Sequence, residues 1–307
     1  MSNSFTPAAD LVIPISRRKF PWLNAGLFVL TCASTLIVGA LLAGAFDGAL
    51  PDDLAEALRQ ILATPSLLWM GAPFSVTLMT ILMAHEMGHY LTCRYYGIKA
   101  SLPYFIPAPT IFGTMGAFIR IRSPIPTRSA LLEVGVAGPI AGFVVAVPAL
   151  LMALTRSRFI EADPSSGFIG FGEPIIFKLA ALLMGRTPPE GMDISMHPVA
   201  VAAWFGFFAT ALNLLPVGQL DGGHICYALF RNHHKSISQG LVLTLAPLGI
   251  FYWQGWLIWA ALLLFIGMRH PVTVDDSAPL GRRQIRLGWI GLILFVLCFT
   301  PIPFYVG

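Results

Sequence analysis

Long apolar runs separated by short polar segments dominate this chain. Helices that cross a bilayer need about 20 mostly apolar residues, and seven runs are candidates for such helices. They lie at about 22–46, 68–93, 129–154, 198–218, 237–252, 255–269 and 287–304. The fifth and sixth runs are short and are separated only by the YWQG region, which favours a tight hairpin. The pattern predicts an all-α polytopic membrane protein with about six to seven transmembrane helices.

One segment between the second and third runs does not follow this pattern. Its sequence, FIPAPTIFGTMGAFIRI, is rich in proline, glycine and aromatic residues and is too broken for a spanning helix. We expect a re-entrant loop or β-hairpin after the second span. Gly113 and Gly116 would let another backbone approach, and an extended peptide could add to such an edge as a strand. A hairpin with a purely structural role is the alternative.

Composition supports a membrane location. Of the 307 residues, 56% are hydrophobic and only 11% are charged, whereas soluble proteins carry about 25% charged residues. The net charge of +4 is modest, and we expect no nucleic-acid partner. We expect a cytoplasmic N-terminal segment at 1–21 and a single membrane domain at 22–307. Within that domain, a core at about 65–230 precedes C-terminal helices at 237–304.

The distribution of charge predicts an orientation. With the N-terminus in the cytoplasm and alternating spans, the cytoplasmic side has 14 of the 19 Lys and Arg residues, as the positive-inside rule requires. These are Arg17, Arg18, Lys19, Arg94, Lys99, Arg120, Arg122, Arg128, Arg231, Lys235, Arg269, Arg282, Arg283 and Arg286. The opposite side receives most of the acidic residues. The inverted topology would reverse both biases.

Candidate chemistry begins at the end of the second run, which reads AHEMGHY. His85 and His89 are four residues apart, so a helix places both imidazoles on one face, within reach of one metal ion. Glu86 lies about 100° around the helix axis from His85 and can reach a water molecule without being a ligand. Two histidines with a carboxylate base are the arrangement of zinc peptidases. The alternative is a pair of interfacial histidines bonded to backbone carbonyls.

A catalytic zinc site needs a third protein ligand, and the sequence offers few candidates. Asp221 lies in NLLPVGQLDGGH at the end of the fourth run, which the topology places at the same depth as His85 and His89. Glu133 opens the third run near this level, where we prefer a bond to a backbone group or an arginine. His224 is a weaker candidate that we place behind the ligands.

The segment around Asp221 shows signs of a broken helix. Pro216 removes a backbone donor, and three glycines permit irregular backbone around the carboxylate: Gly218, Gly222 and Gly223. Asn213 could hydrogen-bond a peptide carbonyl or stabilise an oxyanion, with a helix–helix hydrogen bond as the alternative. His233 and His234 fall in the short polar stretch RNHHK, where we expect solvated surface.

The pairing of HEMGH in the second run with NLLPVGQLDGG in the fourth resembles the site-2 protease family of intramembrane zinc metalloproteases. The resemblance extends over about residues 73–228, and the intervening stretch is similar to the branch found in bacteria, archaea and chloroplasts. It implies one Zn²⁺ per chain, cleavage of a transmembrane helix in or near the bilayer, and a glycine-containing element beside the cleft. The implied roles are zinc ligation for His85, His89 and Asp221, general base for Glu86, and substrate binding for Gly113 and Gly116. The catalytic contribution of Asn213 rests on its own position in the sequence.

The resemblance also implies partners and a location. The expected partners are a transmembrane-helix protein substrate, the lipid bilayer, and a separate upstream protease or adaptor. The segment 155–197 is too short for the PDZ domain of some relatives, and no CBS pair follows the last run, so we expect the minimal form. The expected location is a bacterial cytoplasmic (inner) membrane, with the N-terminus and the active site on the cytoplasmic side.

Three rival functions use the same residues. A metal or proton transporter also places polar groups in broken helices, but here the ionisable groups cluster at one level and no repeat is seen. An inactive relative would bind membrane helices without cutting them, although the expected base and ligands are all present. Metal-dependent hydrolysis of a non-peptide substrate, such as a lipid, is the third alternative.

Overall fold

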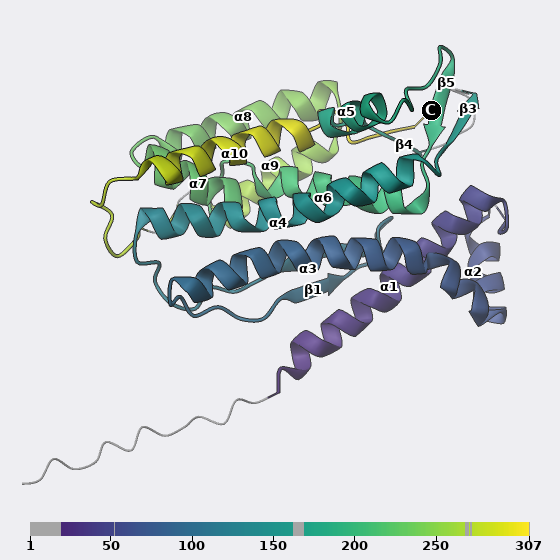
Figure 1. Ribbon diagram of the computed structural model, residues 1–307, viewed down its shortest axis with the longest axis horizontal. Helices are drawn as coiled ribbons and strands as arrows, with labels where there is room; N and C mark the ends of the chain where they lie inside the picture. The colour runs from purple at the N-terminus through teal and green to yellow at the C-terminus, as the bar shows by residue number, and fades with distance from the viewer. Residues whose placement is uncertain (1–19, 52, 162–168, 268–269, 271, 307) are drawn as a thin grey trace, which may run out of the picture.

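The computed structural model describes residues 20–51, 53–161, 169–267, 270 and 272–306 (Figure 1). The helices are α1 (Trp22–Asp47), α2 (Leu54–Ala63), the 3₁₀ helix η1 (Pro65–Gly71), α3 (Ala72–Tyr95), α4 (Arg128–Leu154), α5 (Ile175–Leu183), α6 (Pro198–Asn213), α7 (Asp221–Phe230), α8 (His234–Phe251), α9 (Gly255–Ile266) and α10 (Arg282–Cys298). The strands are β1 (Tyr104–Pro107), β2 (Thr114–Phe118), β3 (Arg158–Glu161), β4 (Ile169–Phe171), β5 (Met192–Ser195) and β6 (Phe304–Val306). The N-terminal segment expected at 1–21 lies almost wholly outside the described residues.

Three helical segments within the described part of the chain are long and apolar enough to cross a membrane: α1, η1 continued by α3, and α4. The expected count of six to seven spans is not confirmed. Helix α6 has 16 residues and α9 has 12, and 16 helical residues extend only about 24 Å, against a hydrocarbon core of about 30 Å. Helices α8 and α10 begin with polar turns, which lowers their mean hydropathy.

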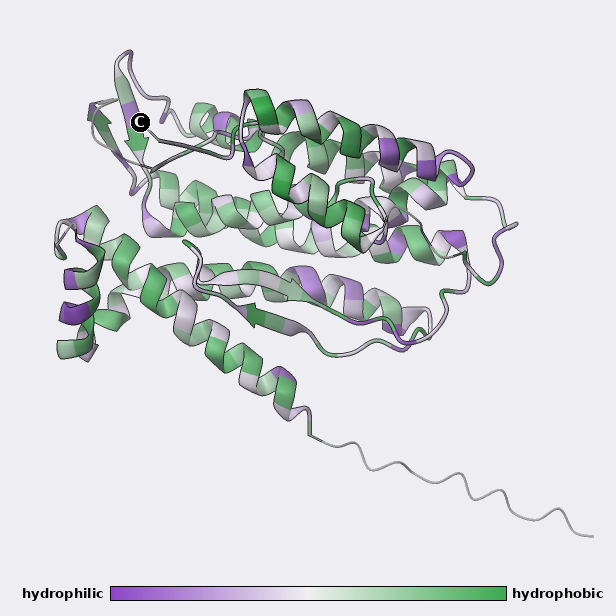
Figure 2. Ribbon diagram, turned by 180° about the vertical axis from the view of Figure 1, so that it is seen from behind, coloured by the Kyte–Doolittle hydropathy of each residue, from purple (hydrophilic) through white to green (hydrophobic). Residues whose placement is uncertain are grey.

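The distribution of polarity over the fold suits a bilayer. Figure 2 shows mostly hydrophobic helix flanks, while hydrophilic segments gather toward the two ends of the helices. Helices α8 and α9 contact each other and are joined by the short turn at 252–254, so the expected tight hairpin is confirmed. The described part of the chain is mostly helical, but it also contains three two-stranded antiparallel pairs: β1–β2, β3–β5 and β4–β6.

The expected β-hairpin after the second span is present as β1 and β2. Tyr104 pairs with Phe118, and the register shifts between Phe105 and Pro107. Helix α1 fixes the hairpin at two places. The Asn24 side-chain amide donates to the carbonyls of residues 102 and 103 at 3.0 and 2.9 Å, and the Ser34 hydroxyl donates to the carbonyl of residue 113 at 2.6 Å. The strand pair therefore lies along α1 and α3 rather than free in the bilayer (Figure 1).

An aromatic cluster connects α6 to the small strands at the end where the chain terminus lies. Trp204 of α6 is fully buried and donates its indole N–H to the Gly172 carbonyl at 2.7 Å. Its ring lies 5.1 Å from those of both Phe171 and Phe304, which belong to the paired strands β4 and β6. These contacts attach β4 and β6 to the membrane helices.

The backbones of α1 and of the start of α3 lie close together where each has a glycine, Gly39 and Gly71. A methyl group on Gly39 would lie 2.5 Å from the Gly71 carbonyl oxygen, and one on Gly71 would lie 2.1 Å from the Leu36 oxygen. Both distances are far below van der Waals contact. Small residues that permit such close backbone approach are typical of helix contacts in membranes.

We expect Gly39→Ala to separate these helices and to destabilise the fold by roughly 1–3 kcal/mol, the usual cost of overpacking. The measurement is the thermal unfolding midpoint in detergent, which should fall. Gly26→Ala is the matched control, because Gly26 lies in the same helix with nothing within 4 Å of an added methyl group. Equal midpoints for the two variants would contradict the packing argument.

Candidate metal centre

Helix α3 presents two histidines inside the fold. His85 and His89 are one helical turn apart, and their side chains are almost fully buried. Their Nε2 atoms lie 3.2 Å from each other. The helix pattern of the sequence thus produces the expected common face, and it points toward the interior.

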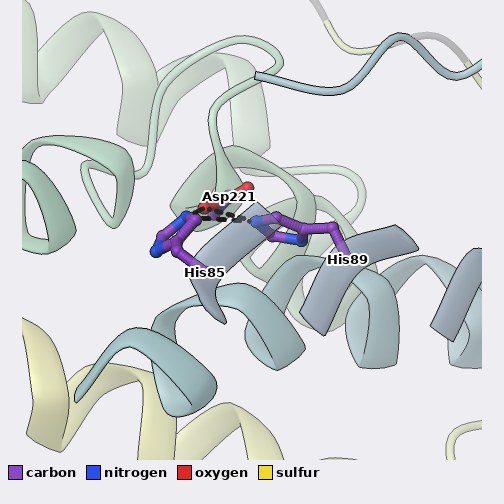
Figure 3. A group of neighbouring side chains, drawn as sticks. All are labelled: His85, His89 and Asp221. Atoms are coloured by element: carbon purple, nitrogen blue, oxygen red, sulfur yellow. Dashed lines mark hydrogen bonds and ion pairs between the residues drawn. The ribbon is translucent and has the colours of Figure 1, made fainter. Parts of the chain in front are cut away.

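Asp221 completes a triangle with these two nitrogens, as Figure 3 shows. Its Oδ2 atom lies 3.2 Å from Nε2 of His85 and 3.2 Å from Nε2 of His89. Within the described part of the chain, this is the group of histidine, cysteine and acidic ligands that is close enough to hold one metal ion. Asp221 is the first residue of α7, and Gly222 and Gly223 follow it inside the helix.

The dimensions of this triangle fit a zinc ion. Ligand atoms about 2.0 Å from a tetrahedral centre lie about 3.3 Å from one another, close to the three separations of 3.2 Å found here. The donor set of two imidazole nitrogens and one carboxylate oxygen is typical of catalytic zinc sites, which leave the fourth position open.

The backbone of α4 orients one ligand. Nδ1 of His89 lies 2.7 Å from the carbonyl oxygen of Val134. A carbonyl can only accept, so Nδ1 carries the proton and Nε2 keeps its lone pair toward the triangle. This contact has no signal in the sequence, because its acceptor is a backbone atom.

Glycines of α4 make room for both histidines. A methyl group on Gly138 would lie 2.1 Å from Nε2 of His89, and one on Gly142 would lie 3.3 Å from Nδ1 of His85. A methyl group on Gly88 of α3 would in turn lie 2.5 Å from the Ala137 oxygen. The run of small residues at 135–142 predicts close packing of α4 against a neighbouring helix. It also leaves room for the side chains of His85 and His89 between α3 and α4.

The break between α6 and α7 brings Asp221 to the triangle. Helix α6 ends at Asn213, and residues 214–220 turn the chain, with Gly218 in the left-handed region at φ 55°. Irregular backbone was expected on both sides of Asp221, but the structure has it only before Asp221, at residues 214–220. Gly222 and Gly223 are helical instead, and methyl groups on them would lie 1.9 Å from the Leu214 oxygen and 2.4 Å from the Gly218 oxygen. They allow the turn to pack against α7.

The triangle and Glu86 share a cavity of about 180 Å³ that the hairpin helps to enclose. Glu86 is 5% exposed and lies beside the ligands without being one of them. Residues of the hairpin and of the segment after it also line this cavity, namely Ala117, Phe118, Ile119 and Ile121. A buried carboxylate that shares a cavity with three ligand atoms is a candidate general base.

Asn213 lies at the same cavity, with Nδ2 3.3 Å from Nε2 of His85. The two hairpin glycines differ in their surroundings. Gly116 lines a second cavity of about 300 Å³, next to His85 and Glu86, and nothing lies within 4 Å of a methyl group added to it. Gly113 packs against α1, where a methyl group would lie 2.7 Å from the Ser34 oxygen. Both have positive φ, 98° and 75°.

Two residues weighed as further candidates, Glu133 and His224, have other surroundings. Glu133 accepts from Arg283 at 3.2 Å and from Gln284 at 2.7 Å, so the expected bond to an arginine is confirmed. His224 lines the cavity behind the ligands, and its Nδ1 lies 2.6 Å from Nε2 of His270. No spacing pattern in the sequence connects His224 with His270, so this contact could not be predicted.

The expectation of solvated surface was wrong for His234. It is 3% exposed, and its ring lies 5.7 Å from that of Tyr227 and 5.8 Å from that of His270. The neighbouring His233 is exposed, as expected. The difference arises because α8 begins at His234 and turns that side chain toward α7.

Known proteins share this sequence pattern. Residues 73–251 match the family described as Peptidase family M50. A relative named "Probable zinc metalloprotease EGY2, chloroplastic" from Arabidopsis thaliana is 30% identical over 292 residues, 92% of this chain and 49% of the relative. The protein of the same name from Oryza sativa subsp. indica is 32% identical over 233 residues, 73% of this chain and 41% of the relative.

A third relative, "Probable zinc metalloprotease EGY1, chloroplastic" from Arabidopsis thaliana, is 31% identical over 241 residues, 75% of this chain and 43% of the relative. The chain thus spans about half the length, or less, of these curated relatives. No solved structure matches it. The family match covers more than half of the chain, including both elements that form the triangle, so the chain belongs to peptidase family M50, the site-2 protease family.

Proposed function

We propose that this chain is an intramembrane zinc metalloprotease that hydrolyses a peptide bond in or near a transmembrane helix of a membrane-protein substrate. The observation that carries the proposal is the triangle of ligand atoms with a buried carboxylate beside it. His85, His89 and Asp221 would hold one zinc ion per chain, and Glu86 shares their cavity. Family membership and the names of the curated relatives support zinc as the metal and proteolysis as the reaction.

The zinc ion, Glu86 and Asn213 would each have a separate role in the proposed reaction. A zinc ion at this position would supply Lewis-acid activation of water and of the scissile carbonyl. Glu86 accepts the proton of the attacking water and delivers it to the leaving amine, as a general base and then acid. Asn213 is placed to donate its amide N–H to the carbonyl oxygen as negative charge develops there.

The hairpin is the proposed site of substrate alignment. A helical peptide bond is shielded by its own hydrogen bonds, so a substrate must unwind before it can react. Strand β2 borders both cavities beside Glu86, and an unwound segment could add along this strand. Gly116 leaves open space above the strand, whereas Gly113 shapes the turn against α1.

We also propose that the N-terminus and the site face the cytoplasm, because that orientation satisfies the positive-inside rule. The expectation of a bacterial cytoplasmic membrane stays a prediction, since the curated relatives are named as chloroplastic proteins. An upstream protease or adaptor likewise stays a prediction.

Glu86→Gln tests the proposed reaction. We expect zinc content to remain at one per chain, because the ligands are intact, while cleavage of single-span test helices falls by at least about 100-fold through loss of the base. The measurement pairs metal analysis with product detection by mass spectrometry, for wild type and variant in the same detergent.

Retained cleavage in the Glu86→Gln protein would contradict the role of the base. Zinc-dependent ion flux in sealed vesicles, without peptide products from wild type, would favour a transporter instead. Binding of test helices with no cleavage by wild type would favour a non-cleaving relative.

Gly138→Ala tests the metal centre without replacing any of the three ligand residues. We expect zinc content to fall well below one per chain, because the added methyl group would occupy the position of the His89 ring. The matched control is Val144→Ala on the same helix, where the side chain is 62% exposed and lies away from the triangle. Equal zinc content in both variants would contradict the claim that Gly138 makes room for the His89 ring.

Ala209→Phe tests the second cavity as a substrate site. Ala209 lines that cavity on α6, opposite the hairpin. We expect a larger side chain there to raise KM for test helices, most for those with bulky residues next to the scissile bond, and to leave zinc content unchanged. An unchanged KM for all test helices would contradict the proposal that this cavity binds substrate.

A further inference from the structure

An apolar groove of about 530 Å³ lies between α7, α8 and α10, apart from the metal centre. Its walls include Ile225 and Leu229 of α7, Leu241 of α8, and Trp289 and Leu292 of α10. No charged side chain of the described residues lines it. A ligand there must be mainly hydrocarbon.

The groove opens to the outside of the helix bundle. Trp289 is 61% exposed, Phe230 is 54% exposed and Leu292 is 49% exposed. Gly288 and Gly291 bring α10 close to α7 at its floor, where methyl groups on them would lie 2.8 Å from Leu229 and 2.9 Å from Ile225. In a bilayer this opening faces lipid.

The length of the groove corresponds to one leaflet. Along α10 its lining runs from Ile285 to Phe295, and the ten helical steps between them extend about 15 Å. Half of the hydrocarbon core is also about 15 Å. Spread over about 15 Å, the volume of about 530 Å³ corresponds to a mean cross-section of about 35 Å², less than half that of a helix about 10 Å wide. A single extended acyl chain is thinner than a helix and suits this space better.

Unpaired positive charge lies at one end of the groove. Arg282 and Arg286 belong to the first turns of α10, and Lys235 belongs to the first turn of α8. All three side chains are exposed. None of them makes an ion pair with another described residue.

The other charges near this end already have partners. Arg283 pairs with Glu133, and Arg231 pairs with Asp276. Asp275 accepts from the backbone and hydroxyl of Ser277. Arg282, Arg286 and Lys235 have no ion-pair partner among the described residues, so their charge remains available to an anionic headgroup.

We propose that this groove binds one anionic phospholipid, with an acyl chain along α10 and α7 and the headgroup at Arg282, Arg286 and Lys235. Charge complementarity selects this occupant, because basic pockets between membrane helices attract anionic headgroups. The bound chain packs against α7, the helix that begins with Asp221, so the lipid supports the element that carries one metal ligand.

The test is native mass spectrometry of the full chain in detergent with an equimolar mixture of phosphatidylglycerol and phosphatidylcholine that have identical acyl chains. We expect one phosphatidylglycerol to be retained in preference to phosphatidylcholine. Each basic residue near a membrane surface contributes about fivefold to the binding of anionic lipid. The double variant Arg282→Gln with Arg286→Gln should therefore lower this preference roughly 25-fold.

Two matched pairs control the experiment. Lys99→Gln removes an exposed cation outside the groove and should leave the preference unchanged. Leu292→Trp fills the groove and should abolish retention, whereas Ile293→Trp, at an exposed neighbour on α10 that does not line it, should not.

Equal retention of the two lipids by wild type would overturn the proposal, as would an unchanged preference in the double variant. A dimer that Leu292→Trp dissociates would assign the groove to a second copy of the chain and overturn it as well. None of these readouts requires proteolysis, so the result is independent of the proposed enzymatic activity.

Discussion

The contact between α3 and α4 is the constraint on which the site depends. Gly88 lets the two backbones approach, and Gly138 leaves the space that the His89 ring occupies. The same approach brings the Val134 carbonyl to Nδ1 of His89 and so fixes the tautomer that exposes Nε2. Interhelical distance, ring orientation and ligand geometry are therefore set together. A change in one helix surface would alter all three.

The broken helix α6–α7 provides the other half of the site. Backbone that is not helical is costly in a bilayer unless protein surrounds it, and here the turn at 214–220 is buried against α7 through Gly222 and Gly223. The turn lets Asp221 begin a new helix directly opposite the two histidines. Asn213, the last residue before the turn, remains within 3.3 Å of His85. One interruption thus positions two polar side chains.

Much of this could be predicted from the sequence, because periodicity and motif spacing are local. The common face of His85 and His89 follows from helix geometry, and the hairpin follows from its proline and glycine content. Lengths of membrane helices were harder to predict, since hydropathy extends across breaks such as the one after Asn213. Contacts between segments distant in sequence, such as that of His89 with the Val134 carbonyl, have no sequence signature. The buried position of His234 depends on how α8 packs against its neighbours. The polarity of the surrounding stretch predicted an exposed side chain instead.

Helix α1 binds the hairpin at two points, through Asn24 and Ser34. Its outer surface is otherwise apolar and largely exposed, as the 63% exposed fraction of Val29 illustrates. The helix that contacts strand β1 therefore also presents an apolar face to the outside of the bundle. Any tilt of α1 would be transmitted through these hydrogen bonds to the strands. Under the proposed function, movement of α1 and adjustment of the hairpin would then be mechanically coupled.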